Sequence, residues 1–255
     1  MANTRIVMQA LPDFPMVKQG DDLAALIIEA LERIGLSLEN GDILAISSKI
    51  VSKSEGRLVD LRSVTPSQRA HQLAEETRKD PRIVELILGE SVEIARTAPH
   101  VLIVRHRLGF TCANAGIDQS NIGFDSEGTV LLLPEDPDRS ARTLQETLSR
   151  HYDARIGILI SDTHGRPFRL GNLNVAIGLA GIAPLIDQRG EKDLFGRVLQ
   201  ATITPLPDEL AAASGLISGQ ADEGQPVVHI RGVAWTCASS SAQGLVRSAE
   251  EDLYR

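Results

Sequence analysis

The order in which helical and strand-like segments follow one another along the 255-residue chain is the feature that most constrains its fold. Helices are predicted at 21–35, 65–81 and 136–152, and a hairpin is predicted from two β-leaning stretches at 91–97 and 101–105. Strands and helices do not alternate steadily, as they do in doubly wound parallel sheets. This order predicts an α+β fold with mixed antiparallel sheets and helices.

Capping residues and prolines set the predicted helix boundaries. In the first helix, apolar residues recur at helical spacing and Gly35 ends the pattern. Asp136-Pro137 places a capping side chain before a proline, which is typical of a helix start. Thr65-Pro66-Ser67-Gln68 predicts another start, with Thr65 as the cap, and Pro81 is predicted to end that helix. A further helix is predicted to begin near Pro207.

Short apolar runs indicate buried strands. The run at 43–46 leads directly into Ser47-Ser48-Lys49, and the strand predicted at 155–161 delivers Asp162 at its end. Polar chemistry therefore begins where these strands stop. The remaining strands are predicted at 129–133, 198–204 and 226–231.

Three segments have other patterns. The stretch 111–123 is small, polar and aperiodic, which predicts an ordered loop, and 161–171 is predicted to be a second loop. Small residues dominate 172–185, where a tightly packed helix is predicted.

Composition indicates an ordinary globular protein, since 42% of the residues are hydrophobic and 24% are charged. A chain of this length allows one domain or two. No apolar run approaches the roughly 20 residues of a membrane helix, and the first residues lack a signal-peptide pattern, so a cytoplasmic protein without membrane association is expected. Cys112 and Cys237 lie far apart and show no metal-type or redox-type spacing.

The net charge of −8 and the isoelectric point near 5.3 disfavour nucleic-acid binding, because the surface field repels polyanions. The low aromatic content, with 1 Trp, 2 Tyr and 5 Phe, points the same way. A phosphorylated ligand would need local cations or a metal ion.

No phosphate-loop motif is present, since the chain contains neither G-x-x-x-x-G-K-[ST] nor G-x-G-x-x-G. What remains is a set of polar clusters next to predicted strands. The first, 47–57, gathers four serines and three cations that suit phosphate oxygens. A solvated helix start with serine capping explains this cluster equally well.

The other clusters also allow a structural interpretation. Gly116–Asn121 contains one carboxylate, for which an Asx turn is the simpler explanation. Asp162 and Thr163 offer oxygen ligands that suit Mg²⁺ or Mn²⁺, but either side chain could instead cap a helix. The stretch 218–224 could be an ordinary solvated connection. His164 is a lone histidine, which is a weak signal for a catalytic base.

Together the clusters resemble one family, the coenzyme F420-0:L-glutamate ligases. The resemblance runs from near Phe14 to about Val233, and several long motifs in the same order are far more specific than any one of them. The motifs are GDDL at 20–23, SKIVSKSEGR at 48–57, AGIDQSN at 115–121, SDTHGRPFRLG at 161–171, AIGLAGIAPL at 176–185 and GQADEGQPVVHIRG at 219–232.

The resemblance also implies which positions are functional. The family's nucleotide contacts fall on Phe14, Pro15, Met16, Val17, Ser48, Lys53, Asn121, Ser218, Gly219, Gln220, Ala221, Asp222, Glu223, Gly224 and Gln225. Its divalent metal ligands fall on Asp118, Asp162, Thr163 and Gln220, and Lys53, Asp118 and Asp162 are the implied catalytic residues. Arg166 and Arg169 could clamp a substrate carboxylate or phosphate, although surface salt bridges explain them equally well.

The resemblance further implies an intertwined homodimer with an unusual α+β fold. Residues 1–255 would form one ligase unit that could comprise two subdomains, without the C-terminal reductase-like domain that some members carry. The implied activity uses GTP to add L-glutamate to coenzyme F420-0 through an acyl phosphate, which gives F420-1 and, by γ-linkage, F420-2 or longer. Two divalent cations (Mg²⁺ or Mn²⁺) per site are expected, and K⁺ is a further candidate.

Other functions stay open at this point. A related ligase could use ATP or a different acceptor acid, and a catalytically silent homologue would bind nucleotide without turnover. The silent protein is disfavoured because Lys53 and both aspartates, Asp118 and Asp162, are present.

Overall fold

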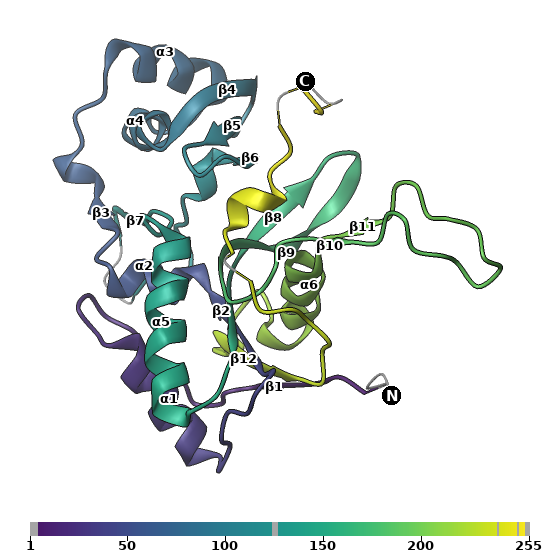
Figure 1. Cartoon of the computed structure of the whole chain (residues 1–255). Coiled ribbons are helices and arrows are strands. Elements are labelled where there is room, and N and C mark those ends of the chain that lie inside the picture. The colour runs from purple at the N-terminus through teal and green to yellow at the C-terminus, as the bar shows by residue number, and fades with distance from the viewer. Residues whose placement is uncertain (1–4, 124–126, 239, 249, 253–255) are drawn as a thin grey trace.

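The structure is a computed structural model that describes residues 5–123, 127–238, 240–248 and 250–252. Within these ranges the centre of the fold is a five-stranded sheet (Figure 1). Its strands, in spatial order, are β1 (Val7–Ala10), β12 (Val227–Arg231), β2 (Ile43–Ser47), β8 (Gly157–Arg166) and β9 (Arg169–Ala180). The β2 and β8 strands run parallel, whereas the other neighbouring pairs of this sheet are antiparallel.

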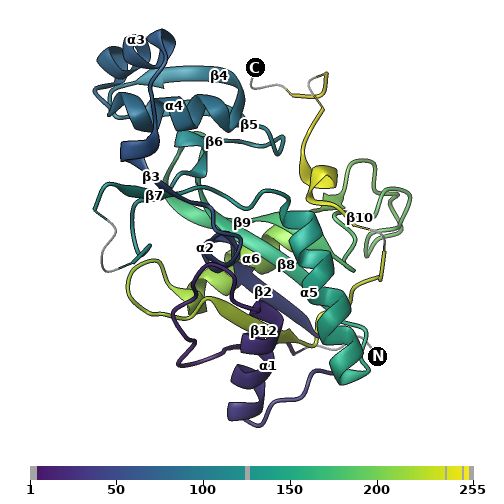
Figure 2. The same ribbon diagram turned by 90° about the vertical axis from the view of Figure 1, so that its left-hand side faces the viewer.

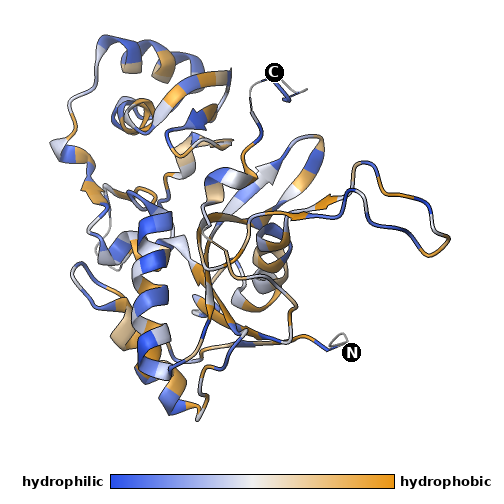
Figure 3. Ribbon diagram, viewed as in Figure 1, coloured by the Kyte–Doolittle hydropathy of each residue, from blue (hydrophilic) through white to orange (hydrophobic). Residues whose placement is uncertain are grey.

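Helices cover both faces of the sheet. Successive side chains of a strand point to opposite faces, so that the apolar residues of one strand belong to two different cores. Leu44 and Ile46 belong to the core formed with α1 (Leu23–Arg33) and α5 (Pro137–Tyr152). Ile43 and Ala45 pack instead with residues of α6 (Leu206–Ser218). Figure 3 shows the resulting pattern, with apolar residues along the strands and a mostly hydrophilic visible face on α5.

A smaller unit lies beyond one edge of the central sheet (Figure 2). Two helices, α3 (Gln68–Thr77) and α4 (Pro81–Gly89), pack on a sheet with the order β4 (Ser91–Ala98), β5 (Val101–His106) and β6 (Thr111–Ala113). A two-stranded ribbon of β3 (Leu58–Asp60) and β7 (Thr129–Leu131) forms where the chain enters and leaves this unit. Short 3₁₀ turns occur at Leu61–Ser63, Asn114–Gly116 and Ala242–Leu245.

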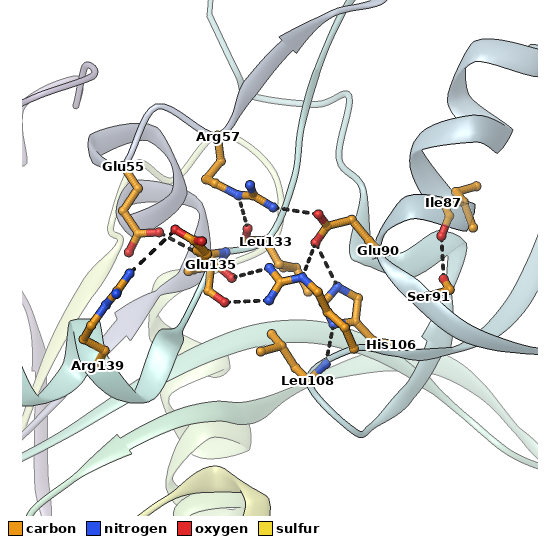
Figure 4. A network of polar contacts seen from close by, with 12 residues as sticks. Glu55, Arg57, Ile87, Glu90, Ser91, His106, Leu108, Leu133, Glu135 and Arg139 are labelled. Carbon is orange, nitrogen blue, oxygen red and sulfur yellow. Dashed lines mark hydrogen bonds and ion pairs between the residues drawn. The ribbon is translucent and has the colours of Figure 1, made fainter. Parts of the chain in front are cut away.

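A largely buried carboxylate ties the smaller unit to the central body (Figure 4). Glu90, which follows α4, accepts hydrogen bonds from Arg57 Nη2 at 2.8 Å and from Arg107 Nε at 2.9 Å. Arg57 also donates to the Leu133 carbonyl, and Arg107 donates to the Glu135 carbonyl. The network therefore joins the end of α4 to the segments on both sides of the β3–β7 ribbon.

A long arm projects from the body between β9 and α6 (Figure 1). It begins and ends with the short pair β10 (Ile186–Asp187) and β11 (Ile203–Thr204). Near its tip, Leu194 is 99% exposed and Phe195 is 94% exposed. The arm therefore presents large apolar side chains on the surface.

Most predicted elements are confirmed. The first helix spans Leu23–Arg33 with Asp22 as its cap, and α5 spans Pro137–Tyr152 with Asp136 as its cap. The predicted hairpin is β4 and β5, and the predicted helix near Pro207 is α6. The strands at 43–46, 129–133 and 226–231 are also present, within one or two residues. The α+β class is confirmed.

The predicted helix at 172–185 is wrong, because most of this stretch belongs to β9. Its small residues serve a close crossing: a Cβ atom on Gly178 would lie 2.6 Å from the Pro137 carbonyl carbon. The predicted loop at 161–171 is also wrong. The β8 and β9 strands continue through this stretch and stay paired as far as Arg166 and Arg169, which are joined by a tight turn. Strand pairing across the hairpin therefore overrides the loop-like composition.

Smaller corrections concern the chain between 65 and 123. Ser67, not Thr65, caps α3, since the Ser67 hydroxyl accepts a hydrogen bond from Ala70 N. Pro81 opens the unforeseen helix α4 with Asp80 as its cap, since proline fits the first turn of a helix. The predicted loop 111–123 contains β6 and a 3₁₀ turn. Of the strand predicted at 198–204, only Ile203–Thr204 is a strand.

No helix within the described residues is both long and apolar enough to cross a membrane.

Candidate functional site

The strand ends bring the predicted polar clusters to one edge of the central sheet. Leu11 N donates to Val227 O at 2.9 Å, Val227 lies opposite Ile46, and Ser47 pairs with Ser161. The loop after β1, the start of α2 (Ser48–Ser54), the second half of β8 and the loop before β12 therefore meet at this edge.

Two carboxylates approach the first turn of α2. Ser48 is buried and its hydroxyl donates to Asp162 Oδ1 at 2.9 Å. Lys49 Nζ lies 2.6 Å from Asp118 Oδ2 and also donates to the Ser120 carbonyl. Because Ser48 and Lys49 are consecutive, the structure brings Asp118 and Asp162 to the same turn of α2.

Lys53 lies one helical turn further along α2. It is 6% exposed, and its ammonium group donates to the Asn121 carbonyl at 2.8 Å. Burial and the neighbouring charge of Lys49 lower the pKa of Lys53. Asn121 Nδ2 in turn donates to the Ala221 carbonyl at 2.7 Å, so that Lys53, Asn121 and the 218–225 loop form one chain of contacts.

Thr163 and Gln220 also meet. Thr163 Oγ1 lies 3.0 Å from Gln220 Oε1 and 3.1 Å from Asn174 Oδ1, and Gln220 Nε2 donates to the same Asn174 oxygen. Asn174 on β9 was not predicted as a site residue. Asn174 reaches the site because β8 pairs with β9, which places Asn174 opposite Thr163.

Local contacts shift the pKa values of two further residues at the site. Burial alone would raise the pKa of Asp118, but the contacts with Lys49 and Ser120 outweigh it and lower this pKa. Burial and the charge of Asp162 raise the pKa of Cys112 to about 12. Cys112 is therefore a neutral thiol at physiological pH, which argues against a nucleophilic role.

The predicted metal ligands fit a hard cation by their chemistry. Asp118, Asp162, Thr163 and Gln220 offer two carboxylates, a hydroxyl and an amide oxygen, and such oxygen ligands suit Mg²⁺ or Mn²⁺. Within the described residues, no three His, Cys, Asp or Glu side chains form a metal-binding group. Asp118 is instead paired with Lys49, whose ammonium supplies the positive charge there.

Only two side chains of the predicted segment Phe14 to Val17 are exposed. The side chains of Phe14 and Val17 pack in the main core, whereas Pro15 and Met16 are exposed. A ligand at this edge could therefore meet the backbone of the segment or its exposed side chains, but not the buried rings and methyl groups.

The remaining predicted residues lie at the rim. The predicted nucleotide loop folds on itself, since Glu223 accepts a hydrogen bond from Ala221 N, and residues 220–224 are exposed. Arg166 donates to the Leu170 carbonyl and Arg169 is exposed, so both lie at the turn of the β8–β9 hairpin.

His164 is a site neighbour that the sequence reasoning set aside. It is 8% exposed, its Nε2 lies 3.2 Å from Asp162 Oδ2, and its ring contacts Phe110 at a centroid distance of 4.9 Å. The signal that could have found it is period 2: in a strand, residues 162 and 164 lie on the same face.

Comparison with known proteins identifies the family of the chain. Residues 13–232 match the family model described as F420-0:Gamma-glutamyl ligase. The proteins named Coenzyme F420:L-glutamate ligase from Methanothermobacter thermautotrophicus and Methanopyrus kandleri are each 47% identical over 243 residues, covering 94% of this chain and 95% and 93% of the relatives. The protein of that name from Methanocaldococcus jannaschii is 40% identical over 245 residues, covering 95% of this chain and 94% of the relative.

A family model that spans most of the chain, and relatives aligned over nearly their full length, leave one conclusion. The chain belongs to the F420-0:gamma-glutamyl ligase family.

Proposed function

We propose that this protein is a GTP-dependent ligase that adds L-glutamate to coenzyme F420-0, with GDP and phosphate as products. The family description names F420-0, and the names of the relatives supply L-glutamate. The observation that carries the proposal is the meeting of Asp118, Asp162, Lys49 and Lys53 around one short helix at the sheet edge. This is the combination of oxygen ligands and cations that phosphate transfer requires.

In the proposed reaction, the terminal phosphoryl group of GTP passes to the F420-0 carboxylate and forms an acyl phosphate. The amine of glutamate then attacks the acyl carbon, and phosphate leaves. This gives F420-1, and a second round through the γ-carboxylate gives F420-2 or longer products. Activation is required because a carboxylate does not react with an amine in water at a useful rate.

The residues of this chain position the reactants and offset negative charge. Asp118, Asp162, Thr163 and Gln220 would hold one or two divalent cations, which neutralise phosphate oxygens when bound. Ser48 orients Asp162 through its 2.9 Å hydrogen bond, and Lys53 brings a buried positive charge to the same edge. Arg166 and Arg169 would meet a substrate carboxylate or phosphate at the rim. K⁺ is a further candidate ion.

We also propose a homodimer, in line with the exposed apolar side chains of the arm and of the β8–β9 turn. Leu194 and Phe195 on the arm, and Phe168 and Leu170 at the turn, are each more than 90% exposed. Light scattering should give twice the chain mass, and the double substitution of Leu194 and Phe195 by Ser should shift it toward the monomer. A monomeric wild-type chain would refute the dimer.

The ligase activity is tested by GDP release from GTP with Mn²⁺, with and without L-glutamate and F420-0, while products are followed by mass. Release that needs both substrates, a product heavier by one or two glutamyl residues and loss of turnover in Asp162→Asn would support the proposal. Turnover with ATP or with another acceptor acid would indicate a related ligase. Tight GTP binding without any mass change would indicate a silent homologue.

A further inference from the structure

A cavity lies next to β9, the outermost strand on one side of the central sheet. Its volume is about 260 Å³. It is bounded by the turn before β6, by β9, by the first turn of α6 and by the segment after the 3₁₀ turn Ala242–Leu245. The lining residues that matter here are Phe110, His164, Val175, Ile177, Asp208 and Arg247.

Asp208 gives this cavity a carboxylate without a cation. Its Oδ1 accepts a hydrogen bond from Ala176 N at 2.9 Å, which satisfies a backbone donor of the edge strand. None of the ion pairs between described residues involves Asp208. Burial raises the pKa of Asp208, as expected for a carboxylate that lacks a counter-ion. A cationic group of a ligand would supply the missing partner.

His164 places the cavity beside the candidate active site. The imidazole lines the cavity, and its Nε2 is buried without an aligned hydrogen bond, 3.2 Å from Asp162 Oδ2. The cavity is therefore separated from the proposed metal ligand Asp162 by a single side chain.

The lining also carries a positive charge. Arg247 lines the cavity and is exposed, and it too makes no ion pair with a described residue. Phe110, Val175 and Ile177 add apolar surface to the lining. The lining also contains a second acidic residue, Asp252. The carboxylate of Asp208, the guanidinium of Arg247 and the apolar surface together match a small zwitterion with a methylene chain.

We propose that this cavity binds the amino-acid substrate, L-glutamate, with its ammonium group at Asp208 and a carboxylate at Arg247. The volume is slightly below the roughly 300–1,000 Å³ of pockets for drug-sized ligands, which suits an amino acid better than a nucleotide or a deazaflavin. The assignment rests on the proposed ligase function, because it names the site of the amine that attacks the acyl phosphate.

The test compares Asp208→Asn with a matched control, Glu209→Gln. The amide oxygen that replaces the carboxylate can still accept the bond from Ala176 N, so that the variant loses the charge but keeps the fold. Glu209 is the next residue of α6, is exposed and does not line the cavity. Apparent KM values for L-glutamate, GTP and F420-0 are measured for each protein, and the melting temperature of each variant verifies folding.

We expect Asp208→Asn to raise the KM for L-glutamate about ten- to a hundredfold, as for a lost hydrogen bond to a charged group, and to leave the other two KM values within about twofold. Arg247→Gln, at an exposed position that does not endanger folding, should raise the same KM. Glu209→Gln should behave as the wild type. An unchanged KM for L-glutamate in both cavity variants, or an equal rise in all three KM values, would overturn the assignment.

Calorimetric titration of L-glutamate alone separates this proposal from the ligase reaction. If the wild type binds L-glutamate and Asp208→Asn does not, the cavity is an amino-acid site even if no turnover with F420-0 is observed. If the wild type turns over and both cavity variants keep wild-type affinity for L-glutamate, the ligase proposal stands and the cavity assignment is wrong.

Discussion

Substitution of Glu90 by Gln tests whether the smaller unit is held to the body by electrostatics (Figure 4). The Glu90 side chain is 13% exposed, and burial alone would raise its pKa. His106, Arg107 and Arg57 outweigh burial and lower this pKa from 4.5 to about 2. That difference corresponds to about 3 kcal/mol of stability from the ionised carboxylate, since one pKa unit is about 1.4 kcal/mol.

The sign of the pH dependence follows from the direction of the shift. The folded protein holds the Glu90 proton less tightly than the unfolded chain, so that the stabilisation is complete well above pH 4.5 and is lost as the pH falls toward 2. Gln has the shape of the protonated acid. The variant should therefore lose about 3 kcal/mol near pH 7, and the difference from the wild type should shrink to about 1.5 kcal/mol at pH 3.

Urea denaturation followed by circular dichroism at pH 7 and pH 3 measures both differences. The control is Glu93→Gln, because Glu93 pairs with Arg105 at 3.2 Å on the surface, with the two side chains 50% and 37% exposed. Surface pairs contribute about 0–1 kcal/mol, so the control should remain close to the wild type. Equal stability of Glu90→Gln and the wild type at pH 7, or a difference that does not shrink at pH 3, would refute the reasoning.

Three further predictions concern the edge of the sheet and its support. Gly178→Ala should destabilise the fold by about 1–3 kcal/mol in urea denaturation, because the new methyl group meets the Pro137 carbonyl; a neutral effect would show that α5 can move away. His164→Phe should weaken Mn²⁺ binding, measured by calorimetry without substrates, about 10–100-fold by removing a neighbour of Asp162, whereas unchanged affinity would leave the imidazole without this role. Lys53→Met should stabilise the ligand-free protein by about 1 kcal/mol in thermal melts, and it should abolish the rise in melting temperature that GTP with Mn²⁺ causes in the wild type. If the melting temperature of the variant still rises with GTP and Mn²⁺, Lys53 does not belong to the site.

The helices that were predicted correctly are those whose starts are set by capping residues next to them in the sequence. Asp22 accepts hydrogen bonds from Ala24 N and Ala25 N and thereby starts α1, and Asp136 does the same for α5 through Arg139 N. These caps are visible as an acid before an apolar or proline-led pattern. The GDDL motif at 20–23 is explained largely by such capping, since Asp21 also accepts a hydrogen bond from Lys18 N.

The errors occurred where distant parts of the chain decide the outcome. Gly178 and its small neighbours suggested a helix, but their small size is required by the crossing of α5 over β9, about 40 residues away in sequence. The wrong prediction of a loop at 161–171 hid the relation of Asp162 to His164, since a loop has no alternating faces. The unpaired charge of Asp208 could not be found from sequence either, because partnership depends on which side chains surround it.

The burial of the Lys53 ammonium group at the candidate site has a cost in free energy that the sequence alone does not reveal. Lys53 is 6% exposed, and its ammonium group contacts the Asn121 carbonyl but forms no ion pair with the described residues, whereas its neighbour Lys49 is paired with Asp118. A buried charge without a counter-ion is costly, and the lowered pKa of Lys53 reflects that cost. This arrangement does not stabilise the fold, because burying an apolar side chain in the same space would cost less free energy than burying the ammonium group. An anionic ligand at the edge of the sheet would provide the missing charge, and this explains how a protein with a net charge of −8 can offer a site for a nucleotide.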